Sequence, residues 1–249
     1  MDRMKEFSTS PYTIKVAMSS DLPGVLEVMR HNFHFEETIF NALCSNAHIT
    51  QEEKNNIEKV LDESVEIAFK SAPCLVAIHN DTNKIIGVNL MTITKNPKLN
   101  DKSREHKNFF DSNNTKSKLV NQYFKYLSEF NEKANLFVKY PKSKAILEFY
   151  AIAVDKNHRK MGISKNLINA GIILAKNIGN ISLVFGVFTS LYSMKSAQKI
   201  GMNILLKIDL LDYKNNEDEL IFENTKPHNI VYIMDYKLKP KTSSSSSSS

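Results

Sequence analysis

The chain has 249 residues, enough for one large domain and short of two average domains joined by a linker. Its composition, 42% hydrophobic and 24% charged, excludes a wholly disordered protein, a collagen-like repeat and a membrane bundle. The net charge of +6 permits an anionic partner, and the placement of the basic residues favours a small anionic cofactor over nucleic acid.

Terminal segments and cysteines narrow the class of protein further. The first twelve residues lack the apolar core of a signal peptide, and no segment approaches the roughly 18 apolar residues of a membrane span. We therefore expect a cytoplasmic protein without membrane contact, a monomer or alternatively a dimer. Cys44 and Cys74 are too few for a disulfide framework or a zinc site, so we expect buried free thiols and no metal. We expect one domain over residues 1–240 and a disordered serine-rich tail over residues 241–249.

Periodicity in the first half of the chain predicts strands and helices in turn. Alternation over residues 12–18 predicts an opening strand, and residues 19–21 offer caps for a helix that runs through Val25, Val28 and Met29. Residues 50–70 have apolar side chains at helical spacing, with Thr50 placed as a cap ahead of Glu53. Two apolar runs, 74–79 and 84–94, flank a turn-forming segment and predict an antiparallel hairpin.

The second half begins with a polar segment, residues 95–118, expected to be a surface excursion that could also cover a site. The elements predicted after it are a helix at 119–140 stopped by Pro141, a buried strand at 145–154, a helix from Gly162 to about Gly179, a buried strand at 182–188, a helix at 190–200 ending at Gly201, and antiparallel strands within 203–213, 220–222 and 229–238. Strand, helix, strand and helix in the centre of the chain, with antiparallel runs around them, indicate a mixed α/β protein.

The strongest chemical signal lies in residues 154–165, which join a buried strand to a helix. Arg159 stands three residues before Gly162, and a glycine at such a junction lets a ligand approach the backbone. Amides of the first helical turn lack partners inside the helix and can donate to an anion. His158, Lys160 and other basic residues crowd this positive end of the helix dipole, so we expect a bound pyrophosphate. The alternative is an ordinary solvated basic turn.

With these residues in place, the chain resembles the GCN5-related N-acetyltransferases, whose cofactor loop has the pattern Arg/Gln-x-x-Gly-x-Gly/Ala after a central strand. It is most similar to the insect-type aralkylamine (dopamine) N-acetyltransferases. That likeness lies in residues 136–141, 146–148, 152–155, 212–214 and 227–228, within a resemblance that spans about residues 12–238. The resemblance implies a central mixed, mostly antiparallel twisted sheet with helices on both faces. Two departures are Ser164, where the family has Gly or Ala, and Lys160, where glycine is frequent.

The resemblance also implies acetyl-CoA as the cosubstrate. Ile152, Ala153 and Val154 would offer strand backbone to the pantetheine arm and to the thioester carbonyl. The pyrophosphate would be held by the loop and the first helical turn, which are Arg159, Lys160, Met161, Gly162, Ile163, Ser164 and Lys165.

An aromatic and acidic stretch, residues 33–38, resembles the Phe-Phe-x-Asp-Glu-Pro-Leu stretch of the insect-type enzymes, with Thr38 in place of the proline. The resemblance makes Glu37 the general base, which the chemistry needs because an alkylammonium with a pKa near 10 is no nucleophile until it loses a proton. The alternative is that Glu36 and Glu37 are surface residues at a helix start. The residues expected to bind the acceptor are Phe33, Phe35, Glu36 and Tyr192.

Hydroxyl and imidazole groups are the remaining catalytic candidates. Ala197 occupies the position of the tyrosine that protonates the leaving thiolate in many superfamily members. The insect-type enzymes instead have hydroxyl residues at positions that resemble Thr189 and Ser193, and the resemblance implies that these assist proton transfer. The alternative is helix capping by Thr189 or Ser190. His228 matches a histidine at the acceptor site, where the resemblance implies that it hydrogen-bonds the substrate or relays a proton, and the alternative is a polar surface residue.

The sequence thus predicts an acetyl-CoA-dependent N-acetyltransferase that moves acetyl directly to the primary amine of an arylalkylamine of the dopamine, tyramine, serotonin or tryptamine type. Two rivals remain. One keeps the fold and acts on polyamines or protein amines, and the other is a coenzyme-A-binding or nucleic-acid-binding module without catalysis.

Overall fold

The computed structural model describes residues 7–99 and 115–239. The serine-rich tail lies outside the described residues, and so does most of the predicted surface excursion over residues 95–118.

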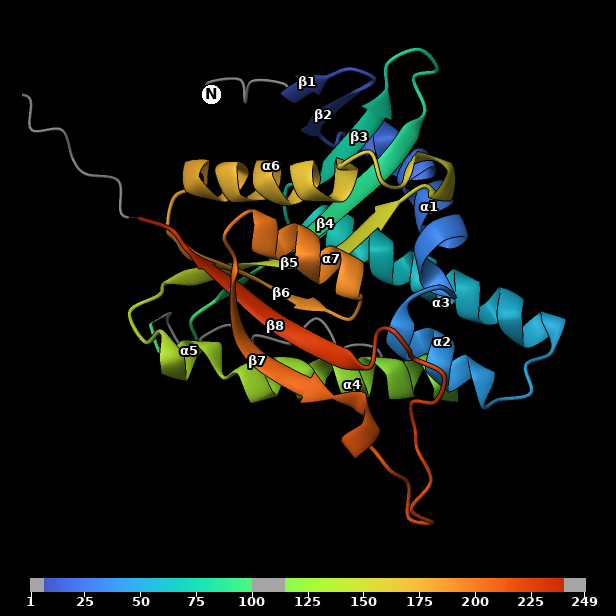
Figure 1. The fold of residues 1–249 in the computed structure, drawn as a ribbon. Coiled ribbons are helices and arrows are strands. Elements are labelled where there is room, and N and C mark those ends of the chain that lie inside the picture. The colour runs from blue at the N-terminus through green and yellow to red at the C-terminus, as the bar shows by residue number, and fades with distance from the viewer. Residues whose placement is uncertain (1–6, 100–114, 240–249) are drawn as a thin grey trace, which may run out of the picture.

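One eight-stranded sheet organises the described residues, in the order β1-β2-β3-β4-β5-β6-β8-β7 (Figure 1). All neighbouring strands are antiparallel except β5 and β6, which are parallel. The strands are β1 (Phe7–Thr9), β2 (Tyr12–Val16), β3 (Leu75–His79), β4 (Ile85–Lys95), β5 (Ala145–Val154), β6 (Ile181–Phe188), β7 (Asn203–Asp209) and β8 (Ile230–Lys237). The predicted mixed, mostly antiparallel sheet is confirmed.

Helices pack on both faces of this sheet (Figure 1). Helices α6 and α7 share one hydrophobic core with the strands, and α1 to α4 form two cores on the other face. The helices are α1 (Leu22–Met29), α2 (Thr38–Ser45), α3 (Gln51–Ser71), α4 (Lys118–Ala134), α5 (Leu136–Lys139), α6 (Ile163–Asn177) and α7 (Leu191–Lys199), with 3-10 turns η1 (Ser19–Asp21), η3 (Lys156–His158) and η4 (Leu210–Asp212) and a π-helical turn η2 (Arg30–His34). No helix within residues 7–99 and 115–239 is both long and apolar enough to span a membrane.

Several predicted elements have the local features that the sequence indicated. Thr50 caps α3 in a capping box, because its hydroxyl accepts from the Glu53 amide while the Glu53 carboxylate accepts from the Thr50 amide. Strands β3 and β4 form the predicted antiparallel hairpin, and the central strands β5 and β6 lie within a residue of their predicted bounds.

Three predicted elements differ from the structure. The helix expected over 119–140 breaks at Asn135, whose φ of 44° is left-handed and therefore ends α4 before α5 begins. The strand expected over 203–213 ends at Asp209, whose carboxylate accepts from the Leu211 amide and starts η4. Residues 220–222 form no strand beyond an isolated bridge at Leu220, and their apolar character reflects the fully buried Phe222 side chain.

The π-helical turn η2 is a feature that the sequence did not predict. It continues α1 and leads into residues 35–37, so it sets the direction in which the acidic stretch leaves the helix. Asn32 anchors this turn, since its amide donates to the Val28 carbonyl and its oxygen accepts from the Lys156 amide, two residues after the end of β5. The acidic stretch and the basic loop are therefore held side by side.

Candidate active site

Strands β5 and β6 separate at the centre of the sheet. Their parallel pairing runs from Ala145 opposite Ile181 to Phe149 opposite Gly186, while β5 continues beside β4 as far as Val154. The register with β4 steps from Phe149 to Ala151, so Tyr150 forms a bulge where the two strands part. A gap therefore opens between the end of β5 and the end of β6.

Backbone groups of β5 face this gap at alternate residues. The Asp155 amide donates to the Ile86 carbonyl of the β4 side, and hydrogen-bonding direction alternates along an antiparallel strand. The backbone of Ala153 therefore faces β4, whereas that of Ile152 and Val154 faces the gap. Two of the three residues predicted to offer backbone to an acyl carrier have the required direction, and Ala153 does not.

The basic loop forms an anion cradle, defined here as residues 162–165 at the start of α6. Gly162 is left-handed with a φ of 77°, and a Cβ built on it would meet no atom within 4 Å. The first bond inside the helix runs from the Asn166 amide to the Gly162 carbonyl, so the amides of residues 163–165 have no partner within the helix. The Ser164 hydroxyl is also buried without a hydrogen-bond partner among the described residues. These donors fit a phosphate group.

Arg159 connects the cradle to the acidic stretch. Its guanidinium lies 2.9 Å from the Glu36 carboxylate, and both side chains are about half exposed. An exposed ion pair of this kind contributes little free energy, so an arriving anion can compete with Glu36 for the guanidinium. The structure thus leaves Arg159 available to a pyrophosphate.

A single cavity of about 790 Å³ joins the gap, the cradle and the acidic stretch, and we call it the active-site cavity. Phe35 and Met161 are absent from its walls, because Phe35 packs on Phe40 with ring centroids 5.6 Å apart and Met161 lies on the surface. Among described residues, no group of three or more His, Cys, Asp and Glu side chains could hold a metal ion. The predicted residues that line the active-site cavity are Phe33, Glu36, Glu37, Ile152, Ala153, Val154, Arg159, Lys160, Gly162, Ile163, Ser164, Lys165, Thr189, Tyr192, Ser193 and His228.

Glu37 is a buried carboxylate in the wall of this cavity, with 7% of its surface exposed. It caps α2, since Oε2 accepts from the Phe40 amide at 2.9 Å, and Oε1 accepts from the Thr189 hydroxyl at 2.5 Å. Burial raises the pKa of Glu37, and these bonds with a further one from the Tyr123 hydroxyl oppose that rise. The surface alternative is therefore wrong for Glu37, whereas Glu36 is exposed at the edge of the same cavity.

The start of α7 brings the remaining candidates together. Ser190 caps the helix by accepting from the Tyr192 amide at 3.3 Å, so the capping alternative holds for Ser190. Ser193 donates to the Ser190 carbonyl at 2.9 Å. His228 accepts from the Leu191 amide on Nδ1 at 3.1 Å, which leaves Nε2 to carry the proton, and burial lowers the pKa of this imidazole.

The cavity wall contains a second carboxylate, that of Glu148, for which the sequence predicted no role. Glu148 on β5 accepts from the Thr92 hydroxyl at 3.1 Å and from the Asn131 amide at 3.4 Å, and burial raises the pKa of Glu148 to about 7. Tyr123 and Tyr150 line the cavity beside it. The sequence did contain a signal for Glu148, because an acidic residue inside an otherwise apolar strand is uncommon without a functional or pairing reason.

Comparisons with solved structures match this architecture, although no family model matches the chain. Arylalkylamine N-acetyltransferase 2 from Aedes aegypti is 25% identical, with a TM-score of 0.75, and the match covers 92% of this chain and 99% of that one. A mosquito arylalkylamine N-acetyltransferase like 5b is 21% identical with a TM-score of 0.68, covering 91% and 100%. A Drosophila melanogaster polyamine N-acetyltransferase that forms N-acetylagmatine is 15% identical with a TM-score of 0.69, covering 91% and 100%.

These likenesses confirm the predicted fold of the GCN5-related N-acetyltransferases. The likeness to the Aedes aegypti enzyme supports the predicted class of enzyme, an acyltransferase.

Proposed function

We propose that the chain is an acetyl-CoA-dependent N-acetyltransferase that moves acetyl to the primary amine of an arylalkylamine of the dopamine, tyramine, serotonin or tryptamine type. The observation that carries the proposal is that one cavity contains a buried carboxylate, Glu37, a gap between two strands and an anion cradle. Similarity to arylalkylamine and polyamine acetyltransferases supports acetyl transfer to an amine.

The donor side of the cavity fits acetyl-CoA, whose thioester supplies the activated acetyl group. The amides of the cradle, the Ser164 hydroxyl and Arg159 would hold the pyrophosphate. The backbone groups of Ile152 and Val154 that face the gap between β5 and β6 would bind the pantetheine arm and stabilise negative charge that develops on the thioester oxygen. Because these groups are fixed by the sheet and the helix start, they need little rearrangement.

On the acceptor side, Glu37 would take the proton from the ammonium nitrogen. An alkylammonium with a pKa near 10 is almost wholly protonated at neutral pH, so its nitrogen needs a base at contact distance or through one water. Burial raises the pKa of Glu37 and so makes its carboxylate a stronger base than an exposed one. Phe33, Tyr123 and Leu127 give the cavity an apolar wall for an aromatic ring.

Acetyl transfer would be direct, and the thiol would leave at the end of β6 near the start of α7. Ser193 and Tyr192 line the cavity there and are the candidate acids for the leaving thiolate. His228 is fixed by the Leu191 amide with its Nε2 proton free to donate to the acceptor or to a thiolate. Thr189 donates to Glu37, so its role is to orient the base.

A polyamine acceptor is the second candidate, and Glu148 is the observation that favours it. This second buried carboxylate lines the same cavity as Glu37, and a pocket with two carboxylates suits an acceptor with two cationic groups.

A thiol-release assay with acetyl-CoA against arylalkylamines, polyamines and peptides tests both acceptors. Release with arylalkylamines supports the proposal, whereas release with polyamines or peptides alone identifies a rival acceptor. Coenzyme A binding by calorimetry without any turnover would identify a binding module instead.

Glu37→Gln tests the base in the same assay. We expect kcat/KM to fall by roughly 100- to 10,000-fold, because a positioned acid or base contributes about that much, while coenzyme A affinity stays unchanged. Glu52→Gln, on the exposed first turn of α3, is the matched control. Full activity of Glu37→Gln would show that another group is the base.

A further inference from the structure

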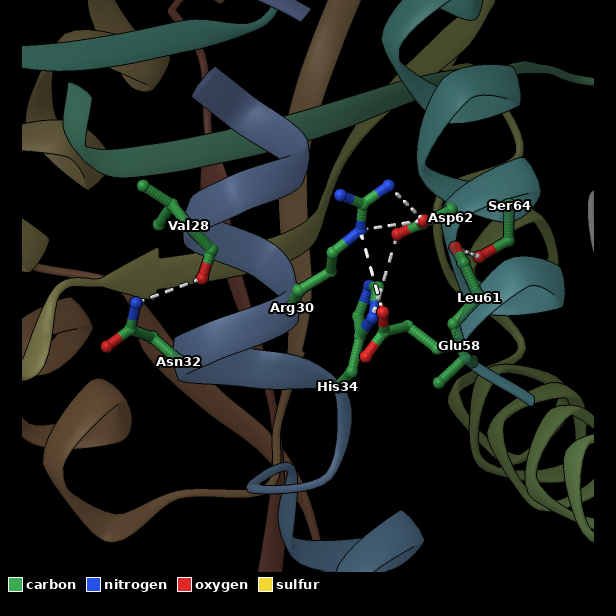
Figure 2. A network of polar contacts seen from close by, with 8 residues as sticks. All are labelled: Val28, Arg30, Asn32, His34, Glu58, Leu61, Asp62 and Ser64. Carbon is green, nitrogen blue, oxygen red and sulfur yellow. Dashed lines mark hydrogen bonds and ion pairs between the residues drawn. The ribbon is translucent and has the colours of Figure 1, made fainter. Parts of the chain in front are cut away.

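A buried histidine without a role in the proposed chemistry lies close to the base. His34 ends the π-helical turn η2 and is 3% exposed, and neither of its ring nitrogens has a hydrogen-bond partner among the described residues. Figure 2 shows its ring between η2 and α3. Its Nδ1 atom lies 3.9 Å from Asp62 Oδ1. Within the described part of the chain, that Asp62 oxygen is also buried without a hydrogen bond, whereas Oδ2 accepts from Arg30 at 2.8 and 2.6 Å.

Beside His34 lies a second, small cavity, about 10 Å³ of which is open to a water-sized sphere. That is close to the minimum for one water molecule, and a buried water needs two to four polar partners. Polar groups are present in its walls, namely those of His34, Ser64, Tyr123 and Tyr150. Phe33, Tyr123 and Tyr150 line both this small cavity and the active-site cavity, so the two spaces share one wall.

Hydroxyl groups of the shared wall connect to both sides. Tyr123 is hydrogen-bonded to Glu37, and Tyr150 is hydrogen-bonded to Ser64, whose own hydroxyl donates to the Leu61 carbonyl at 2.6 Å. Beyond His34, the Asp62 side chain is 13% exposed and lies beside the partly exposed Arg30. Polar groups therefore follow one another from the base to the surface of α3.

We propose that one water in the small cavity completes a proton-exit relay from Glu37 through Tyr123, this water and His34 to Asp62 and the solvent. The inference rests on the proposed function, because it assigns a route to the proton that Glu37 removes from the amine. His34 and Asp62 act through Glu37 and are positioning residues for proton transfer.

Each transfer in the relay breaks one bond to hydrogen and forms one. Glu37 gives its proton to the Tyr123 oxygen as the Tyr123 proton passes to the water, and the water gives a proton to His34 Nε2. When the 3.9 Å separation shortens to hydrogen-bond distance, the proton on His34 Nδ1 passes to Asp62 Oδ1, and Asp62 releases it to solvent. No electrons are transferred, and the total charge is conserved. The His34 imidazole ends in its other neutral tautomer, and proton exchange returns it to the first.

The groups that face His34 are compatible with a neutral ring at rest. Asp62 approaches from α3 and Arg30 from η2, Glu58 lies beside Arg30, and the hydroxyls of Tyr123 and Tyr150 come from α4 and β5. Burial lowers the pKa of His34 to about 4, against the smaller raising effect of Asp62. A neutral imidazole has one donor and one acceptor nitrogen, which a relay requires.

Kinetics of His34→Ala test the relay. We expect kcat to fall about tenfold, less than the loss of the base itself, because the cavity mouth remains a slower exit for the proton. Added imidazole should restore kcat in this variant while the KM for acetyl-CoA stays unchanged. Asp62→Asn should lower kcat in the same direction, and His31→Ala, exposed on the same turn, should match the unmodified chain with and without imidazole. A merely structural role would give no rescue by imidazole.

A crystal structure supplies a readout that does not depend on activity. A water within hydrogen-bond distance of His34 Nε2 and of the Tyr123 hydroxyl is expected, and an empty small cavity, or a water that does not contact Tyr123, would overturn the relay. Unchanged kcat in His34→Ala, or a loss that imidazole does not restore, would overturn it as well. Absence of turnover by the unmodified chain would instead refute the proposed function, and the relay with it.

Discussion

Replacing Thr189 with valine tests the environment of Glu37 directly. Valine keeps the branched shape of threonine and removes the hydroxyl that donates to Glu37 Oε1 at 2.5 Å. The ionised carboxylate then loses one of its donors while burial continues to disfavour the charge, so the pKa of Glu37 rises further.

The size of the shift follows from the strength of that bond. A hydrogen bond to a charged group contributes about 1.5–3 kcal/mol, and one pKa unit corresponds to about 1.4 kcal/mol. Loss of this bond should therefore disfavour the ionised carboxylate by about that free energy, and the pKa of Glu37 should rise. Glu37 is the active base only when ionised, so kcat/KM is lost as pH falls through this pKa, and raising the pKa moves that acid limb to higher pH.

Profiles of kcat/KM against pH for the native chain, Thr189→Val and Thr189→Ser would measure the shift. The serine variant retains a hydroxyl and should keep the acid limb near its native position. Superimposable acid limbs for the native and valine chains would refute the assignment of Glu37 as the titrating base, or of Thr189 as its donor.

Two further predictions concern the donor site and the fold. Arg159→Ala should weaken coenzyme A binding in calorimetry by roughly tenfold or more, because charge-assisted bonds to phosphate are strong, and the difference should shrink at high salt; an unchanged dissociation constant would remove Arg159 from the pyrophosphate site. Thr50→Ala should lower the free energy of unfolding by about 1 kcal/mol through loss of the α3 cap. A melting temperature equal to that of the native chain would contradict it.

Features that depend on neighbours in sequence could be predicted. The capping box of Thr50 and Glu53 needs only residues three apart, and the start of a helix at Gly162 follows from a glycine between a buried strand and an apolar helical repeat. Both appear in the structure where the sequence placed them. The same holds for β5, because ten nearly continuous apolar residues have few alternatives to a buried strand.

Features that depend on packing across the sheet could not be predicted. The sequence pattern placed Tyr123 on the apolar face of a predicted helix, and only the packing of α4 on α2 brings its hydroxyl to Glu37. The break at Asn135 depends on a single left-handed residue, and many Asn residues in helices adopt no such conformation. Phe222 had the local pattern of a strand, and its side chain instead fills a core.

Because Glu37 also accepts from the Phe40 amide, the candidate base is held at the first turn of α2, a helix with buried hydrophobic residues of its own. The Phe40 ring lies 5.2 Å from that of Tyr123, so any repacking between α2 and α4 would tilt the helix and swing the carboxylate with it. Substitutions among hydrophobic residues between α2 and α4 could thereby change kcat without touching a ligand. Laboratory evolution of this chain should find beneficial substitutions at that interface as readily as in the active-site cavity.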